Sequence, residues 1–574
     1  MFAFNLKQKL NKFIFDCLLY CIFSLILNIL AMVKKMMYLP VLLMFSMYTV
    51  SAQKAIQKSE EMIKTFNAEQ RFYAGDYQGS LNVYNDLLKT KPNDANMIFH
   101  IAECYYKLAQ YPQALENVKK AKSIDAKANE DISLLLGKLY HMDGNLDEAL
   151  AEFTAYKSMV TGKKAQESDI DLHISQVNMA KTLMATSVNV KIENATDIIN
   201  SEYDDKTPSV TADGKTLIFT SRRPGKTSAL DIEGDKKYFE DIYIARWDSI
   251  NRKWGAAELL PGNINTEGHD ACSSISPDGK EIYIYKNDVD AESRGGDIYV
   301  SKLSSSGKWG IPKSLGKPIN TTYFEGGACI SPDGNTLYFV SERPGGRGHA
   351  DIYMSKRKDR TAWEVPVNLG PDVNTAEDEG GIFLAPDGKT LFFTSQGFNS
   401  MGGYDIFKTV YENGKWSKPV NLGYPINTIN NDMSLTLSAD AQTGYFASDR
   451  KGGLGDLDIY KIDLIHYPVL EKDMKYKTDS LPAMGILKGT VFNATDGTAL
   501  EAEVVVLDEA GAKIGSTMSS SGSGDYFLTL STAKTYEVKI ELEGYKPISE
   551  KVEIKATKGI GSPTLVKHYL LYKN

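Results

Sequence analysis

The sequence predicts a multidomain protein, helical first and all-β afterwards, with a tetratricopeptide helical array, a five-bladed β-propeller and a small C-terminal β-sandwich. Three observations predict it. A segment of roughly 54 residues recurs five times between Asn200 and Lys461, a helical repeat of close to 34 residues precedes it, and short alternating strands follow it. Periods of these sizes are typical of propeller blades and of stacked helix pairs. At 574 residues the chain is also too long for a single core.

Each copy of the longer repeat opens with a branched residue, Asn, and Ser or Thr, then reaches a turn Asp and an Asp-Ile-aromatic triplet. The opening residues are Asn200, Asn265, Asn320, Asn374 and Asn427, the turn residues are Asp213, Asp278, Asp333, Asp387 and Asp440, and the triplets begin at Asp241, Asp297, Asp351, Asp405 and Asp458. Asp-Gly favours a tight turn, and an Asp that begins a strand can accept a backbone hydrogen bond. Both features are therefore interpreted as structural.

Each copy is predicted to hold three strands and then a fourth that begins at a Trp. These residues are Trp254, Trp309, Trp363 and Trp416, and the fifth copy has no counterpart. Residues 188–192 lie just before the first Asn turn, and we expect them to supply the missing strand. Closing the ring with strands from both ends of the segment removes an open sheet edge.

The helical repeat covers residues 61 to about 160 and alternates small residues, such as Ala102 and Ala114, with aromatic residues, such as Tyr84 and Phe153. Small residues let paired helices approach closely while the rings fill the gap, which is the tetratricopeptide pattern. We predict three repeats and a closing helix over 170–186. Because the aromatic positions are interpreted mainly as core, no peptide-binding residue is assigned to the array.

Five acids lie eight residues before the turn residues and near the predicted start of each blade's first strand. They are Asp205, Asp270, Glu325, Glu379 and Asp432. First strands line the central channel of a propeller, so five carboxylates near one axis could hold a cation through hard oxygen ligands. The alternative is that each accepts hydrogen bonds from backbone groups of a neighbouring blade, and no metal site is assigned.

Basic, glycine-containing loops are predicted on one rim of the propeller, and the first blade extends that rim with residues 227–239. Exposed, asymmetric loops are where a partner is most readily recognised. The candidate partner-binding residues are Arg222, Arg223, Arg343, Arg347 and Arg450.

The first 52 residues form a predicted targeting segment. Met32 opens a conventional signal peptide with Lys34 and Lys35, an apolar stretch, and a small-residue cleavage site before Gln53. The competing interpretation is a membrane helix over 13–33. Tyr20 before Cys21 fits a lipidation box poorly, so attachment by a lipid is not expected.

The cysteines after this segment are Cys104, Cys272 and Cys329. They are odd in number and spread over two predicted domains. They are interpreted as buried free thiols rather than as a disulfide or a metal site.

The sequence motif from Ser331 to Phe339 and its variant from Ala385 to Phe393 resemble the WD40-like PD40 repeat of TolB-type proteins. The C-terminal strands, with Gly524-Asp525-Tyr526-Phe527 among them, are similar to a carboxypeptidase regulatory-like domain. The order of the three domains resembles a family of Gram-negative envelope proteins that includes PorE of the type IX secretion system. Members of this family commonly continue into an OmpA-like domain that binds peptidoglycan. We find no such domain before Asn574, so direct peptidoglycan binding is not expected.

The domain boundaries predicted are 1–52 for targeting, 53–187 for the helical array, 188–465 for the propeller, 466–484 for a linker and 485–574 for the sandwich. The expected function is a non-enzymatic scaffold of the cell envelope, exported to the periplasm or the outer-membrane periphery, which binds other envelope proteins through the array and the propeller rim. A net charge of −8 does not indicate the basic surface that nucleic-acid binding requires, so no nucleic-acid partner is expected. No catalytic residue and no cofactor is assigned.

Two alternatives stay open. One is a periplasmic module that binds a glycan or a peptide. The other is a five-bladed glycoside hydrolase, which would need two carboxylates about 5 to 9.5 Å apart and would have only the channel acids to provide them.

Overall fold

The computed structural model describes residue 14 and residues 18–22, 58–230, 237–287, 295–304, 306–359, 362–471, 484–556 and 562–574. Most of the predicted targeting segment and of the predicted linker, and part of the 227–239 loop, lie outside these residues. The chain divides into two compact units, residues 1–135 and 136–574. Within the described ranges, no helix combines the length and the apolar character needed to cross a bilayer.

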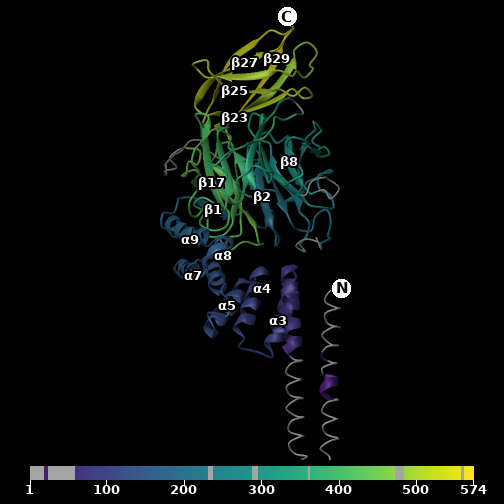
Figure 1. The fold of residues 1–574 in the computed structure, drawn as a ribbon. Helices are drawn as coiled ribbons and strands as arrows, with labels where there is room; N and C mark the ends of the chain where they lie inside the picture. The colour runs from purple at the N-terminus through teal and green to yellow at the C-terminus, as the bar shows by residue number, and fades with distance from the viewer. Residues whose placement is uncertain are drawn as a thin grey trace, which may run out of the picture. The chain divides into compact units, whose positions relative to one another are not determined.

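The first unit is helical (Figure 1). It contains a helix over 58–73, α3 (Tyr77–Leu88), α4 (Ala95–Lys107), α5 (Tyr111–Ile124) and the start of α6 (Ile132–Asp143). Asp76 and Asp94 accept hydrogen bonds from the backbone N–H groups of Gly79 and Met97, which fixes the starts of α3 and α4. Tyr84 and Cys104 are buried between the helices.

The helices of the second unit are α7 (Leu146–Met159), α8 (Gly162–Glu167), α9 (Ile170–Ala185) and the short α10 (Thr196–Ile199), after the end of α6. Phe153 on α7 is fully buried, and a Cβ at Gly137 on α6 would lie 2.5 Å from its ring. A small residue is therefore required at Gly137, as the repeat pattern predicted. The closing helix predicted over 170–186 is α9, which packs on α7.

After the helices the chain forms many small antiparallel sheets. Five of them, numbered here in chain order of their first strands, lie in the described residues 191–463. Sheet 1 holds β2 (Asp205–Val210), β3 (Thr216–Ser221), β4 (Asp241–Asp248), β5 (Lys253–Trp254) and β6 (Glu258–Leu259); sheet 2 holds β7 (Asp270–Ile275), β8 (Glu281–Lys286), β9 (Asp297–Lys302) and β10 (Lys313–Ser314); sheet 3 holds β11 (Glu325–Ile330), β12 (Thr336–Ser341), β13 (Asp351–Lys356) and β14 (Val367–Asn368). Sheet 4 holds β15 (Glu379–Leu384), β16 (Thr390–Ser395), β17 (Asp405–Glu412), β18 (Lys415–Trp416) and β19 (Val420–Asn421), and sheet 5 holds β20 (Asp432–Leu437), β21 (Thr443–Ser448), β22 (Asp458–Asp463) and β1 (Lys191–Asn194).

The first strands of the five sheets contact one another in a closed cycle. β2 contacts β7, β7 contacts β11, β11 contacts β15, β15 contacts β20, and β20 contacts β2 again. Sheet 5 takes its outer strand from the other end of the segment, because β1 pairs with β22 from Lys191 opposite Asp463 to Asn194 opposite Tyr460. The strand predicted to close the ring is thus present, three residues later than expected at its start. The arrangement is compatible with a β-propeller.

The Trp residues predicted to begin the fourth strands pair at or just after the end of the third strand, but this pairing is short and is interrupted. Trp254 and Trp416 belong to the short β5 and β18, and Trp309 and Trp363 make single bridges. The strands that complete the sheets begin four residues later in each case (254 to 258, 309 to 313, 363 to 367 and 416 to 420). A Pro or a small residue separates each Trp from its strand, which interrupts the ladder.

One side chain repeats the same bond between every pair of neighbouring sheets. The opening Asn of each repeat accepts a hydrogen bond from the N–H of the triplet Ile in the preceding sheet and donates one to the carbonyl of the same Ile. The pairs are Asn265 with Ile242, Asn320 with Ile298, Asn374 with Ile352, Asn427 with Ile406 and, across the closure, Asn200 with Ile459, at 2.7 to 3.0 Å. We call this pair of bonds the Asn clasp.

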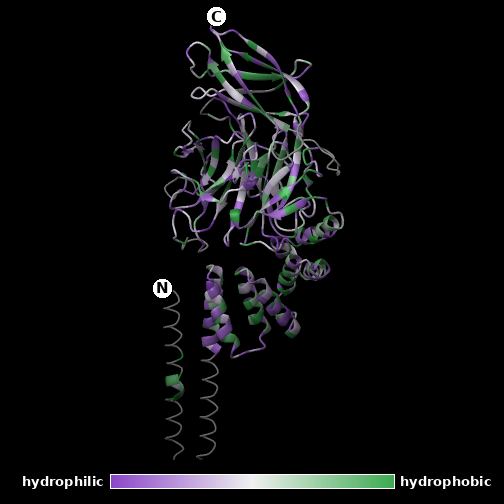
Figure 2. Cartoon of the chain, turned by 180° about the vertical axis from the view of Figure 1, so that it is seen from behind, coloured by the Kyte–Doolittle hydropathy of each residue, from purple (hydrophilic) through white to green (hydrophobic). Residues whose placement is uncertain are grey.

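Two further sheets follow from residue 484. One has the order β26-β23-β29, with β23 (Met484–Asn493), β26 (Asp525–Ser531) and β29 (Thr564–Leu571); the other has the order β25-β24-β27-β28, with β24 (Glu503–Leu507), β25 (Lys513–Met518), β27 (Lys534–Glu541) and β28 (Ile548–Ile554). Their inward residues, such as Val491, Val504 and Val538, share one core. Figure 2 shows hydrophobic stretches along these strands and those of the five sheets.

The Asn clasp should carry much of the stability of the ring. We expect Asn320→Ala to lower the free energy of unfolding by about 2–4 kcal/mol, because it leaves the buried N–H and carbonyl of Ile298 without partners. All five Trp lie between Trp247 and Trp416, so tryptophan fluorescence during urea unfolding reports on the β-region alone. Asn335→Ala, at an exposed turn of sheet 3, is the matched control and should change stability by less than about 0.5 kcal/mol. Equal effects of the two substitutions would contradict the role of the clasp.

Candidate functional site

The five predicted acids lie at the first residue of the first strand in each sheet and are 0 to 2% exposed. Each carboxylate accepts two hydrogen bonds from the Ser or Thr four residues earlier, one from its N–H and one from its hydroxyl. The pairs are Ser201 with Asp205, Thr266 with Asp270, Thr321 with Glu325, Thr375 with Glu379 and Thr428 with Asp432. The donors belong to the acid's own turn and not, as the alternative prediction had it, to a neighbouring blade.

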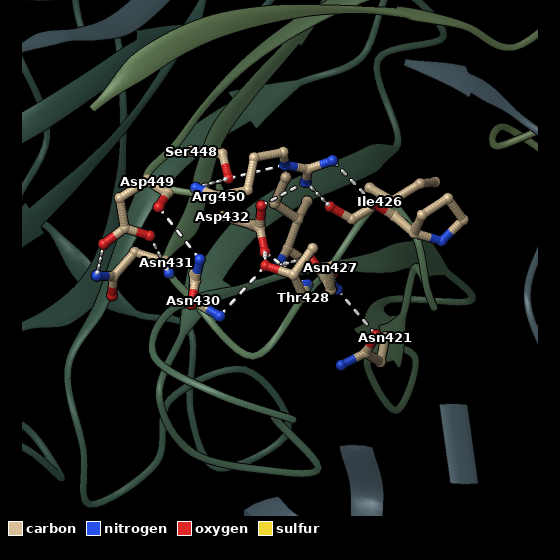
Figure 3. A network of polar contacts seen from close by, with 12 residues as sticks. Asn421, Ile426, Asn427, Thr428, Asn430, Asn431, Asp432, Ser448, Asp449 and Arg450 are labelled. Atoms are coloured by element: carbon tan, nitrogen blue, oxygen red, sulfur yellow. Dashed lines mark hydrogen bonds and ion pairs between the residues drawn. The ribbon is translucent and has the colours of Figure 1, made fainter. Parts of the chain in front are cut away.

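An arginine completes this arrangement in sheets 1, 3 and 5. In sheet 5 the guanidinium of Arg450 pairs with Asp432 and donates to the hydroxyl of Ser448 and to the carbonyl of Ile426 (Figure 3). It also stacks on the ring of Phe446 at 4.9 Å. Arg223 and Arg343 do the same in sheets 1 and 3 with Asp205 and Glu325. A buried carboxylate paired with a guanidinium and further hydrogen bonds is well compensated for the loss of water.

These contacts change the interpretation of the arginines. Arg223, Arg343 and Arg450 are engaged within their own sheets, and Arg222 is 7% exposed with its Nε donating to the carbonyl of Tyr238. The prediction that all five candidate arginines are exposed rim residues is therefore wrong for four of them. Arg347 alone among the five is exposed.

The other two sheets depart from this pattern in different ways. In sheet 2, Lys286 takes the place of arginine and its Nζ lies 2.7 Å from Asp270, with both groups buried. In sheet 4, Gly397 stands where the arginine would be, and a Cβ there would lie 2.5 Å from Thr375 Oγ1. The ring of the next residue, Phe398, lies against Phe393 and Phe407.

Glu379 therefore has hydroxyl and N–H donors but no cation beside it. Thr375 and Ser395 donate to it. Burial raises the pKa of Glu379 to about 7, against these hydrogen bonds and with a smaller contribution from the negative charge of Asp351. The five acids therefore differ in charge, because a large fraction of Glu379 is protonated and uncharged near pH 7.

The acids do not form a shared metal site. Each carboxylate is occupied within its own sheet, and among the described residues no three His, Cys, Asp or Glu side chains converge as metal ligands would. The five acids were a reasonable cation hypothesis from the sequence, but their geometry supports a structural role.

The predicted buried thiols are found. Cys104, Cys272 and Cys329 are free and buried. Cys329 Sγ accepts a hydrogen bond from the N–H of Leu384 in the next sheet. Burial raises the pKa of Cys329 to about 11, so the thiol is neutral and unreactive at physiological pH.

Loops of sheets 4 and 5 contact the helices of the same unit. His141 on α6 donates from Nε2 to the carbonyl of Met401 at 3.0 Å, and Gln176 on α9 donates to the hydroxyl of Ser400. His141 is 7% exposed, and burial lowers its pKa. The pKa of His173, stacked on Phe153, is lowered to about 4 by burial and by the charge of Lys138. The lowered pKa values favour the neutral form of both imidazoles at this junction.

The opposite turns of four of the five sheets contact the C-terminal sheets. Ile486 packs against Ala212 and Ala439, and Lys280 pairs with Asp525. The hydroxyl of Ser562 donates to the carbonyl of Ala212, and that of Thr529 to the carbonyl of Pro386. The turns of sheets 1, 2, 4 and 5 are thereby partly covered.

A groove of about 600 Å³ lies in the first unit. It is lined by Lys58, Glu61, Met62, Thr65, Phe66, Glu69 and Lys91. Met62 and Phe66 are more than half exposed. An open groove with exposed apolar side chains and charges of both signs suits a peptide better than a small metabolite.

The arginines of the network were assigned the wrong role, although the sequence carries a signal for the right one. Arg223, Arg343 and Arg450 each follow their acid by 18 residues (205 to 223, 325 to 343 and 432 to 450). The same spacing from Glu379 reaches Gly397, which marks sheet 4 as the exception.

No family model matches the chain, and no curated protein matches it. Among solved structures, the chain is similar to the Yersinia enterocolitica type III secretion chaperone SycD in complex with a peptide of the translocator YopD, with 15% identity, a TM-score of 0.20, and coverage of 21% of this chain and 93% of that one. It is similar to PcrH in complex with the chaperone binding region of PopD, with 16% identity, a TM-score of 0.20, and coverage of 22% and 95%. It is also similar to an α-L-arabinofuranosidase from Lactobacillus brevis, with 14% identity, a TM-score of 0.32, and coverage of 47% and 94%. The N-terminal region is helical with tetratricopeptide-like neighbours, and the resemblance to Gram-negative envelope proteins stays a prediction.

Glu379 should give the β-region a distinctive pH dependence. Its folded pKa of about 7 exceeds its ordinary value of 4.5, so the folded state holds the proton more tightly and stability falls as pH rises from about 4.5 to about 7. The loss should be on the order of 2–3 kcal/mol. Urea unfolding between pH 5 and 8 should show this component in the wild type and not in Glu379→Gln. Asp432→Asn, which removes the partner of Arg450, should instead be destabilised at pH 8; a wild-type pH profile in Glu379→Gln would rule the assignment out.

The contact between helices α6 and α9 and the loop of sheet 4 should weaken at acidic pH. His141 and His173 have lowered pKa values, so their contribution is complete above about pH 6.5 and is lost as pH falls towards about 4. Lys138 is the charged neighbour of His173 and adds repulsion to the protonated form. Hydrogen exchange of residues 396–404 should rise several-fold between pH 7.5 and 5, after correction for the intrinsic rate. His141→Gln, which keeps an N–H donor, should reduce that rise, whereas His349→Gln on an exposed loop should leave it unchanged.

Proposed function

We propose that this protein is a non-enzymatic scaffold of the cell envelope, in which a tetratricopeptide array, a five-bladed propeller and a C-terminal β-sandwich bind other envelope proteins. The blade count is supported by five repeats, five sheets in the described residues 191–463 and a closed cycle of first strands. The sandwich is supported by two sheets that share one core.

The observation that carries a scaffold role is the state of the charged ring. All five acids accept hydrogen bonds from their own turns, and four of them face an Arg or Lys from the same sheet. A glycoside hydrolase needs two carboxylates that are free to protonate a leaving group and to attack or activate water. Carboxylates fixed in structural ion pairs are poorly placed for either task, which favours binding over catalysis.

Two surfaces of the described residues are candidates for partners, the groove beside Phe66 and the loop that carries Arg347 and His349. The groove suits a peptide segment with apolar and charged side chains, and the loop suits an acidic surface. Several binding domains in one chain raise one another's effective concentration on a multi-site partner. The predicted signal peptide and the resemblance to envelope proteins suggest the periplasm or the outer-membrane periphery, within a secretion or outer-membrane assembly.

A periplasmic module that binds a glycan or a peptide on its own is the second candidate. The groove beside Phe66 is the observation that favours it, because a free peptide would need no further surface. The two candidates differ in whether the loop of Arg347 also contacts a protein.

Site-specific crosslinking in cells tests the proposal. A photoactivatable residue at Phe66 or Arg347 should give defined adducts with envelope proteins, identified by mass spectrometry from separated membrane and periplasmic fractions. Asn251, at an exposed hairpin tip on the outer side of sheet 1, is the control position and should give none.

Adducts at Phe66 alone would support the peptide-binding module. No reproducible adduct at either position would overturn the scaffold proposal.

A further inference from the structure

The C-terminal β29 is an edge strand with an exposed apolar row. It pairs with β23 on one side, and no second strand of the described residues lies along its other side. Val566, His568 and Leu570 alternate with inward residues and point to the same exposed face, with Val566 50% and Leu570 52% exposed. Long edge strands with apolar faces are templates for pairing with another strand.

The backbone N–H and carbonyl groups of these three residues face the open edge of β29. The carbonyls of Pro563 and Leu571 accept hydrogen bonds from Ile486 and Ala494, so the odd-numbered residues direct their backbone groups towards β23 and its neighbours. Backbone groups alternate along a strand, so those of Val566, His568 and Leu570 point to the open edge. The carbonyl of Tyr572 already accepts a hydrogen bond from Lys546, so the open stretch ends before it.

Several other edges of the described sheets are protected, although the edge strand β25 also exposes Ile514 and Met518. The outer strands β10, β14 and β19 are two residues long and follow Pro312, Pro366 and Pro419, which blunt pairing. The edge strand β28 exposes Ser549, Lys551 and Glu553 rather than apolar residues. β29 lacks both forms of protection over Val566–Leu570, so its edge is suited to a partner strand.

We propose that β29 pairs with β29 of a second copy of this chain, antiparallel, about a two-fold axis through His568. In this register Val566 of each copy lies opposite Leu570 of the other, and His568 lies opposite His568. The three residues whose backbone groups face the open edge are matched, and the Val566–Leu570 pair forms twice by symmetry. A register centred one residue later would require the backbone of Tyr572, which is occupied. The self-complementary row therefore selects a second copy over an unrelated strand.

The first test is the oligomeric state of the purified protein. Sedimentation equilibrium should show a concentration-dependent dimer, and Leu570→Lys should shift it to monomer. Ile514→Lys, on β25 and equally exposed at 51%, should leave the dimer intact. A monomer at all concentrations, or equal loss of the dimer in both variants, would overturn the inference.

The second test fixes the register. Opposed residues in a hydrogen-bonded antiparallel pair have Cα atoms about 5.5 Å apart, within the range of a disulfide. His568→Cys should form a covalent dimer on mild oxidation, and Val566→Cys alone should not.

A mixture of Val566→Cys and Leu570→Cys proteins should form the mixed dimer. The native Cys104, Cys272 and Cys329 are buried and should not contribute. Crosslinking of Ile514→Cys as readily as of His568→Cys would show random collision and contradict the pairing. Failure of these tests would leave the proposed scaffold function untouched, because that function rests on Phe66 and Arg347.

Discussion

The hydrogen bonds between an Asn side chain and the backbone of the preceding sheet are the constraint on which the β-region depends. Neighbouring sheets in the ring are not joined by a shared backbone ladder. Each interface has a backbone hydrogen bond at the acid, as from the N–H of Asp270 to the carbonyl of Glu240, and the directional contact of the Asn side chain. The Asn amide supplies both a donor and an acceptor and satisfies both backbone groups of one buried Ile. Because Asn200 makes the same contact with Ile459, closure uses the same bond as every other interface.

Four of the five sheets pair the acid next to the clasp with a cation, and sheet 4 does not. Three arginines and one lysine neutralise four acids, whereas Gly397 stands at the arginine position of sheet 4 and burial raises the pKa of Glu379 to about 7. The loop that carries Phe398 also presents Ser400 and Met401 to the helices. The loop of sheet 4 that departs from the repeated pattern is thus also one that contacts the helices.

The repeats in the sequence were enough to predict the order of helices and sheets, the closing strand and the position of the acids at the start of each first strand. The Trp positions gave only part of each fourth strand, because Trp254 and its counterparts pair with the end of the third strand and the chain then leaves the ladder, pairing again four residues later. The role of Arg450 was not evident from the sequence, since a basic residue close to glycines usually indicates an exposed loop. Its burial depends on Phe446 and Asp432, which lie on two other strands and meet it only in the folded sheet.

The pairing of β1 with β22 also sets an order of events for the chain as it is made. Residues 191–194 emerge early, and their partner at 458–463 emerges more than 260 residues later (458 − 194 = 264). Until then the first and the last sheet of the row each lack one neighbour, and non-local pairing of this kind is slow because the loop must close before the contacts form. Emergence of residues 458–463 is therefore the earliest moment at which the ring can close, and a chain halted before residue 458 would present an unclosed row of sheets to chaperones and proteases.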